Sequence, residues 1–264
     1  MKRRSTGITA TEAERGVEMS LFGWLKAVFV LSACCAVALV SGCQTLCARD
    51  PFAPRKMSGT WVSLGTSITW YNDNLKGMAG RGLSRGYQDR VRDVLAFDGF
   101  LNLGCNGGTV GTQLGNVKAG DYYTIEHGIN DWGHSVPVGT IADYRNPGAK
   151  NGTFCATYRK LVDKIRALNP QAKIILCTPR RGYGFHGYLP ARCEEPKNGI
   201  YLREYADAVR AIAAEEGFPL VDFYATCGEQ DELASLSIDV ALHPNDAGFE
   251  RMAHELLKAF ATVE

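Results

Sequence analysis

Residues 61–67 read Trp-Val-Ser-Leu-Gly-Thr-Ser, a short apolar run that ends in a glycine and two hydroxyl side chains. Four more such runs cover residues 100–103, 122–125, 173–177 and 218–223. Short apolar strands that alternate with amphipathic helices are typical of a mostly parallel sheet covered on both faces. The sequence therefore predicts an α/β fold, a three-layer α/β/α sandwich around a five-stranded, mostly parallel sheet.

The helices of this fold are expected where apolar residues recur at helical spacing, over residues 86–96, 155–168, 199–214 and 246–262. In the second of these, the apolar face is formed by Tyr158, Leu161, Val162, Ile165 and Leu168. Sites in open α/β sheets lie beyond the carboxyl ends of the strands. The residues that follow each predicted strand are therefore the candidates for function.

The composition excludes several classes of protein. The 264 residues carry 29 Lys and Arg against 28 Asp and Glu, a net charge of +1, whereas nucleic-acid binders that use bulk charge need a basic surplus. The hydrophobic share of 45% is ordinary for a globular protein and argues against disorder. We expect one domain with a sizeable core, no nucleic-acid partner and a monomer.

The N-terminal region carries an export signal in this interpretation. Residues 27–41 contain no charge, are too few for a membrane span of about 20 residues, and follow Lys26. The run closes on Val40-Ser41-Gly42-Cys43, which resembles the bacterial lipoprotein signal, where the cysteine after the cut is lipidated. An uncleaved anchor and a plain secretory signal are the alternatives.

This interpretation divides the chain into a signal peptide over 1–42, a lipidated tether over 43–58 and a hydrolase domain over 59–264. Met19 is an alternative start. The protein would be an exported lipoprotein of the cell envelope, on the periplasmic or outer-membrane side, and would contact the membrane only through the lipid on Cys43.

The cysteines and histidines bear on disulfides and metals. Six cysteines remain beyond Cys43, an even number that permits disulfides in an exported protein: Cys47, Cys105, Cys155, Cys177, Cys193 and Cys227. We expect one or two bridges, with the pairing open. The chain contains no Cys-x-x-Cys, and its five histidines are scattered, so we expect no metal and no cofactor.

Polar blocks follow three of the predicted strands and precede the last helix: Gly65-Thr66-Ser67, Gly104-Cys105-Asn106-Gly107-Gly108-Thr109, Gly128-Ile129-Asn130-Asp131 and His243-Pro244-Asn245-Asp246. They supply a hydroxyl, a glycine-rich loop, an amide and an imidazole near carboxylates. Acyl transfer requires a nucleophile, a base, an orienting group and oxyanion donors.

In this order the four blocks resemble the SGNH hydrolase superfamily, the GDSL-like esterases, over about residues 59–262. The resemblance implies a flavodoxin-like topology and a serine esterase. It implies that Ser67 is the nucleophile and His243 the general base. The oxyanion hole would consist of the backbone N–H groups of Ser67 and Gly107 and the side-chain amide of Asn130.

Two positions depart from the family pattern. Thr66 stands where the family usually has an Asp that braces the turn, and a Thr hydroxyl can make some of the same backbone hydrogen bonds. The family acid usually lies three residues before the histidine, where this chain has Val240. Asp239, four residues before His243, is the candidate acid, and a Ser-His dyad is the alternative.

Two long connections, residues 132–153 and 179–199, are the candidate walls of the substrate site, although they could be surface loops with local packing. Their candidate substrate-binding residues are aromatic, imidazole or guanidinium side chains: Trp132, His134, Arg180, Arg181, Tyr183, Phe185, His186 and Tyr188. Resemblance to carbohydrate O-acetyl esterases implies acetyl groups on carbohydrate as the substrate. A lysophospholipase or thioesterase of the same fold, or a non-catalytic glycan-binding relative, is the alternative.

Overall fold

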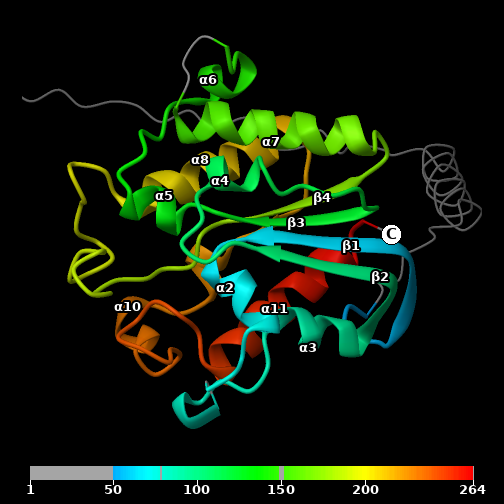
Figure 1. Cartoon of the computed structure of the whole chain (residues 1–264), viewed down its shortest axis with the longest axis horizontal. Coiled ribbons are helices and arrows are strands. Elements are labelled where there is room, and N and C mark those ends of the chain that lie inside the picture. Colours follow the sequence, from blue (N-terminus) through cyan, green and yellow to red (C-terminus); the bar gives the residue numbers. More distant parts are fainter. Residues whose placement is uncertain (1–49, 78, 149–151, 264) are drawn as a thin grey trace, which may run out of the picture. The chain divides into compact units, whose positions relative to one another are not determined.

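The computed structural model describes residues 50–263, apart from 78 and 149–151 (Figure 1). The predicted signal peptide, the lipidation site Cys43 and Cys47 lie outside the described residues. Within the described part, no helix combines the length and the apolar character that a membrane span requires.

The centre of the fold is a five-stranded sheet in the order β2-β1-β3-β4-β5, with every neighbouring pair parallel. Its strands are β1 (Arg55–Gly65), β2 (Leu95–Gly104), β3 (Tyr122–Glu126), β4 (Lys173–Cys177) and β5 (Leu220–Val221). This order is that of flavodoxin-like sheets. The predicted α/β class and five-stranded sheet are confirmed.

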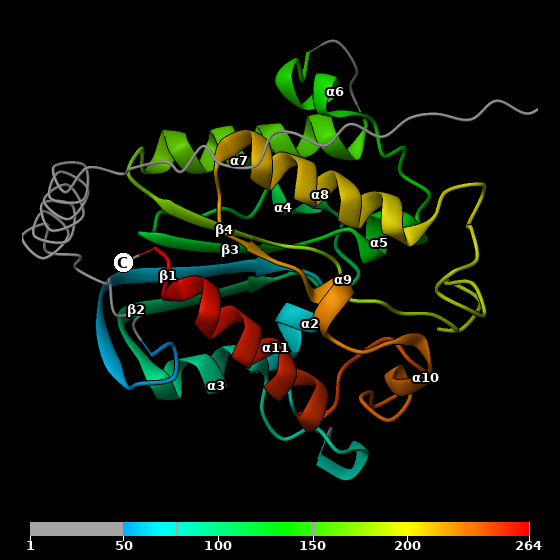
Figure 2. The same ribbon diagram turned by 180° about the vertical axis from the view of Figure 1, so that it is seen from behind.

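Helices cover both faces of the sheet (Figures 1 and 2). The helices α3 (Tyr87–Val94) and α11 (Asp246–Phe260) pack on one face, and α4 (Val110–Gln113), α7 (Phe154–Leu168) and α8 (Leu202–Glu216) lie on the other. The three predicted layers are therefore present.

Alternation along β1 supplies both hydrophobic cores. Trp61 faces the α11 side, where its ring centroid lies 4.9 Å from that of Phe100 and 5.3 Å from that of Phe260. Val62 faces the α7 side and is fully buried there. Because successive side chains of a strand point to opposite faces, one strand anchors both helical layers.

Short helices follow the strands at the edge where the carboxyl ends meet. They are α2 (Ser67–Trp70) after β1, α5 (Ile129–Gly133) after β3, and α9 (Phe223–Thr226) after β5. Two others, α6 (Ile141–Arg145) and α10 (Gln230–Leu233), lie in longer connections. Figure 1 shows α2, α5 and α10 on the same side of the molecule as this edge.

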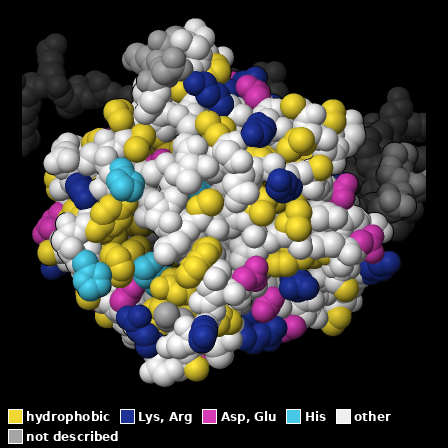
Figure 3. Space-filling model, viewed as in Figure 1, with side chains coloured by type: hydrophobic (Ala, Val, Ile, Leu, Met, Phe, Trp, Pro, Cys, Tyr) yellow, Lys and Arg dark blue, Asp and Glu magenta, His cyan; other side chains and the backbone are white. Residues whose placement is uncertain are grey.

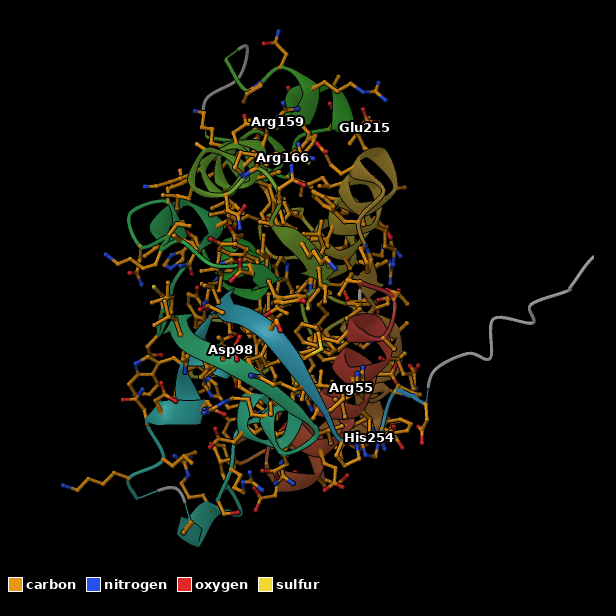
Figure 4. All side chains as sticks on the ribbon, turned by 90° about the vertical axis from the view of Figure 1, so that its right-hand side faces the viewer. Arg55, Asp98, Arg159, Arg166, Glu215 and His254 are labelled. Carbon is orange, nitrogen blue, oxygen red and sulfur yellow. The ribbon has the colours of Figure 1, made fainter. Side chains whose placement is uncertain are left out.

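The outer surface of α7 and α8 carries ion pairs. Arg166 lies 2.6 Å from Glu216, and Arg145 of α6 lies 2.6 Å from Glu215. Figure 4 shows Arg159, Arg166 and Glu215 together on this helical layer. A solvent-exposed pair such as Arg145–Glu215 contributes at most about 1 kcal/mol, so burial of the inner helix faces holds the layer to the sheet.

The structure corrects the predicted element boundaries. Residues 55–58, expected in the tether, belong to β1, because residues 55–57 pair with residues 95–97 of β2. Met57 is buried there. The last strand is shorter than expected, since Pro219 has no N–H group and contributes only its carbonyl oxygen, which accepts a hydrogen bond from Leu176.

The described cysteines form no disulfide with one another. Cys105, Cys155, Cys177, Cys193 and Cys227 are all free thiols. The expectation of bridges among these five is therefore wrong. Three of them, Cys155, Cys177 and Cys227, belong to the hydrophobic cores, where a thiol packs as a small apolar side chain.

Candidate active site

Ser67 lies at a sharp turn where β1 ends and α2 begins. The turn requires a glycine at position 65, because a Cβ there would lie 2.1 Å from the Thr69 hydroxyl oxygen. Ser67 is the first residue of α2 and is 4% exposed. The turn therefore places the hydroxyl group at the carboxyl edge of the sheet.

Thr66 is held by a buried carboxyl group. Its hydroxyl group donates a hydrogen bond of 2.7 Å to Glu126 Oε2, and its oxygen accepts one of 3.3 Å from the N–H of Ile68. The backbone N–H of Thr66 lies 3.3 Å from the same Glu126 oxygen. A threonine at this position thus caps α2 and ties the turn to the end of β3, so the first departure from the family pattern is accommodated.

Three side chains form a continuous hydrogen-bonded series. Ser67 Oγ lies 2.9 Å from His243 Nε2, and His243 Nδ1 lies 2.5 Å from Asp239 Oδ2. His243 is 6% exposed. The structure therefore brings together the three residues that the sequence assigns to nucleophile, base and acid, in the geometry that a catalytic triad requires.

The extra residue between Asp239 and His243 is absorbed by a tight turn. Asp239 Oδ1 accepts hydrogen bonds from the backbone N–H groups of Leu242, at 2.9 Å, and His243, at 3.1 Å. Burial acts to raise the pKa of Asp239, but the hydrogen bonds and the charge of His243 hold that pKa below its ordinary value. The carboxylate is therefore ionised at neutral pH and aimed at the imidazole.

Side chains of α5 hold the glycine-rich loop that follows β2. Gly107 has φ +70°, a backbone conformation that favours glycine. The Asn130 side-chain amide donates to the Gly108 carbonyl at 3.0 Å, and the carboxyl group of Asp131 accepts from the Val110 N–H at 3.2 Å. Consecutive residues of α5 thus fix the loop that carries the predicted oxyanion donor.

Replacement of Asn130 by Ala is expected to lower kcat by about 10²–10³-fold, because loss of one oxyanion donor has an effect of that size. Steady-state kinetics on a chromogenic acetate ester would measure it. Asn116→Ala is the matched control, since the Asn116 amide contacts the same loop through Cys105 Sγ, at 3.9 Å, and has no proposed catalytic role. Asn130→Ala activity within threefold of wild type would refute the role.

Glu126 is a buried acid that the sequence reasoning missed. Burial raises its pKa to about 7, although hydrogen bonds from Thr66 act in the opposite direction. The folded state therefore binds this proton more tightly than the unfolded state. Between pH 4.5 and about 7, the contribution of Glu126 to the free energy of unfolding falls as the pH rises.

Glu126→Gln should remove this pH dependence, because the amide oxygen can still accept from Thr66 but the group cannot ionise. Relative to wild type, the free energy of unfolding of the variant should improve by about 3 kcal/mol between pH 5 and pH 8. Urea denaturation across this range is the measurement. The exposed Glu250→Gln is the control, and a parallel pH dependence of Glu126→Gln and wild type would contradict the prediction.

Two predicted substrate-binding residues are buried and cannot serve in that role. Trp132 is 0% exposed, and its indole N–H donates to the Ile200 carbonyl at 2.8 Å. Arg180 is also 0% exposed, and its guanidinium donates to the Leu242 carbonyl. Each finds its hydrogen-bond partner inside the protein, so neither is free to contact a substrate.

The other six predicted substrate-binding residues lie nearer the surface. His134 and His186 are exposed, and Tyr183 is half-buried. The ring centroid of His134 lies 5.3 Å from that of Tyr188. Figure 3 shows histidine and hydrophobic side chains gathered on the left of this face, on the side where α5 lies in Figure 1.

Two aromatic rings flank the imidazole of His243. Tyr71 and Phe185 each meet it edge to face, with ring centroids 5.1 Å from that of the imidazole. The sequence reasoning considered Phe185 but missed Tyr71. Tyr71 lies four residues after Ser67, about one helical turn, and that spacing was the available signal.

The described residues contain no group of three or more His, Cys, Asp or Glu side chains placed to hold a metal ion.

Comparison with known proteins identifies related chains. A family model described as GDSL-like Lipase/Acylhydrolase matches residues 63–251. A curated relative, the uncharacterized esterase YxiM of Bacillus subtilis, is 25% identical over 224 residues. The match covers 81% of this chain and 49% of YxiM, so the chain spans about half the length of that relative.

Solved structures with the same fold include one described as a possible lipase from Chitinophaga pinensis, with a TM-score of 0.66 and 28% identity, covering 78% of this chain and 98% of that one. Another is a member of the lipolytic G-D-S-L family from Veillonella parvula, with a TM-score of 0.51 and 20% identity, covering 77% and 98%. The second likeness shows the fold alone. The family model spans the serine turn, the glycine-rich loop and the His243 turn, and the chain belongs to the GDSL-like lipase/acylhydrolase family of ester hydrolases.

Proposed function

We propose that this protein is a serine esterase that removes O-acetyl groups from carbohydrate through an acyl-enzyme. The observation that carries the mechanism is the hydrogen-bonded series from Ser67 through His243 to Asp239. The two departures from the family pattern motivated the alternative of a non-catalytic relative. Both are compensated by contacts of Thr66 and Asp239, which favours the enzyme.

In the first half-reaction, Ser67 Oγ attacks the ester carbonyl carbon while its proton passes to His243 Nε2. The carbonyl oxygen becomes an oxyanion that accepts hydrogen bonds from the N–H groups of Ser67 and Gly107 and from the Asn130 amide. The bond to the leaving alcohol then breaks, and the alcohol takes the proton from His243. Asp239 keeps the proton of the imidazole on Nδ1 and stabilises the cation that forms.

In the second half-reaction, His243 takes a proton from water, whose oxygen attacks the acetyl-enzyme. The same oxyanion donors stabilise the second tetrahedral species. Its collapse releases acetate and returns the proton from His243 to Ser67 Oγ, which restores the free enzyme.

The carbohydrate part of the proposal is supported by rings near the triad: Phe185 packs on His243, and the Tyr188 hydroxyl group donates to the Asn130 carbonyl at 3.1 Å. Phe185 and Tyr188 are half-buried and His134 and His186 are exposed, so their faces and edges are available to a polar ring with apolar C–H groups. We also propose that the protein is an exported lipoprotein, on the basis of the sequence that ends at Cys43.

The test is a substrate panel with the full-length protein and its Ser67→Ala variant. Acetylated xylan, an O-acetylated sialic acid, a lysophospholipid and an acyl thioester would be compared, together with labelling by a fluorophosphonate. We expect release of acetate from the sugar esters and labelling of wild type only. Faster hydrolysis of the lysophospholipid or thioester would show that the substrate is not an acetylated carbohydrate. Folded protein that neither hydrolyses any ester nor reacts with the fluorophosphonate would refute the proposal that the protein is an enzyme.

A further inference from the structure

Arg180 is a fully buried cation that contacts the segment carrying Asp239 and His243. It follows β4 by three residues and is among the largest side chains that have no solvent exposure. One guanidinium nitrogen donates to the Leu242 carbonyl at 3.2 Å, and another donates to Ser237 Oγ at 3.3 Å. Both acceptors belong to the segment that carries Asp239 and His243.

That segment is a narrow turn with two arms. Ser237 and Pro244 form an isolated antiparallel bridge, and the Ile238 N–H donates to the His243 carbonyl at 2.8 Å. Arg180 reaches one acceptor on each arm, and Ser237 Oγ in turn donates to the Leu233 carbonyl at 2.6 Å. The guanidinium therefore links the two arms of the turn.

The charge of Arg180 is not neutralised by an ion pair. Among the residues that the structure describes, no carboxylate lies within ion-pair distance of the guanidinium, and its Nε has no hydrogen-bond partner. Burial lowers the pKa of Arg180 to about 10, while Asp239 and Cys227 act to raise it and Arg251 to lower it. The group is thus cationic at neutral pH, and an unpaired buried charge is costly compared with an apolar side chain of similar size.

We propose that Arg180 is a positioning residue, which holds the Asp239–His243 turn in register with Ser67 and whose positive charge favours the unprotonated, basic form of the pair. This inference rests on the proposed function. A side chain that served packing alone would not need to be charged, whereas a cation near the pair opposes its protonation.

Several other groups face His243 and also contribute to the pH dependence of activity. Asp239 faces it from its own turn, Ser67 from α2, and Tyr71 from the turn that follows α2. Phe185 faces it from the segment after Arg180 and carries no charge. Arg81 acts on Tyr71. All of these groups remain in the Arg180 variants.

The experiment compares Arg180→Met, Arg180→Lys and Arg210→Met in the full chain. Arg210 is the matched control, because it pairs with Asp222, lies over the Tyr224 ring and has no proposed role in the site. Arg180→Met should lower kcat by roughly 10–100-fold with little change in KM, since small misplacement of reacting groups has effects of this size. The acidic limb of its kcat/KM profile should move to higher pH.

Arg180→Lys retains the charge, so its acidic limb should stay in place and its kcat should lie between those of Arg180→Met and wild type. Arg210→Met should behave as wild type. Loss of activity in Arg180→Met that only follows the loss of folded protein, with an unmoved acidic limb, would overturn the proposal. An equal shift of that limb in Arg180→Lys and Arg180→Met would also overturn the role of charge.

A second measurement does not need turnover. The hydrogen-bonded proton on His243 Nδ1 should give a low-field proton NMR signal in wild type and Arg180→Lys that is weakened or lost in Arg180→Met. Wild-type protein that hydrolyses no ester but shows this pattern would refute the proposed function and keep the inference. Wild-type protein that hydrolyses esters, together with an unchanged NMR signal in Arg180→Met, would refute the inference and keep the proposed function.

Discussion

Ser67→Ala is expected to lower kcat by about 10⁶-fold, because the variant loses the atom that forms the acyl-enzyme. His243→Ala should have an effect of similar size, since without the base the hydroxyl group of Ser67 keeps its proton. The double variant should be little worse than either single variant, because the two residues act as a unit. Initial rates on an activated acetate ester, with active-site titration, would measure all three.

Ser84→Ala is the matched control for Ser67→Ala. The Ser84 hydroxyl group is exposed and donates to Asp246 at 2.7 Å, outside the catalytic series. Its activity should be that of wild type. Residual activity above one-tenth of wild type in Ser67→Ala would show that another group is the nucleophile.

Asp239→Asn is expected to lower kcat by about 10⁴-fold. The amide can still accept the backbone N–H bonds of Leu242 and His243 through its oxygen. Its NH₂ group then faces His243 Nδ1, where it favours the tautomer with the proton on Nε2 and so blocks proton transfer from Ser67. The variant should fold as wild type does, but His243 should no longer act as a base. A thermal melt would measure the stability of the fold, and steady-state kinetics would measure the loss of kcat.

Asp246→Asn is the control for this variant, because Asp246 also lies near His243 in sequence but binds Ser84, Arg85 and Arg90. Its kcat should remain within a few-fold of wild type. If Asp239→Asn stayed within tenfold of wild type, Ser67 and His243 would suffice as a dyad.

The parts of the site that lie at strand ends were predictable from sequence. Each predicted strand is a short apolar run, and a parallel sheet brings the residues after such runs to one edge. Ser67 and Asn130 lie after β1 and β3 for this reason. The contact between Asp239 and His243 was not predictable. It depends on the conformation of the turn, in which the Asp239 carboxylate accepts hydrogen bonds from two backbone N–H groups.

The substrate-binding predictions show where sequence reasoning fails. A Trp or Arg just after a strand has the same appearance whether it faces solvent or the interior. The difference lies in partners far along the chain, since Trp132 donates to Ile200 and Arg180 to Leu242. The start of β1 at Arg55 escaped prediction for the same reason, because residues 55–57 are fixed by their pairing with residues 95–97 of β2.

The placement of the triad along the chain has a consequence for folding. Ser67 and His243 are separated by 176 residues, whereas Asp239 and His243 are separated by four. The acid and base can thus meet within one local turn, while the nucleophile joins them only when the first strand and the last helix are both in place. Recovery of hydrolysis after dilution from urea should therefore lag behind recovery of circular dichroism, and enzyme activity becomes a reporter of the final long-range closure of the chain.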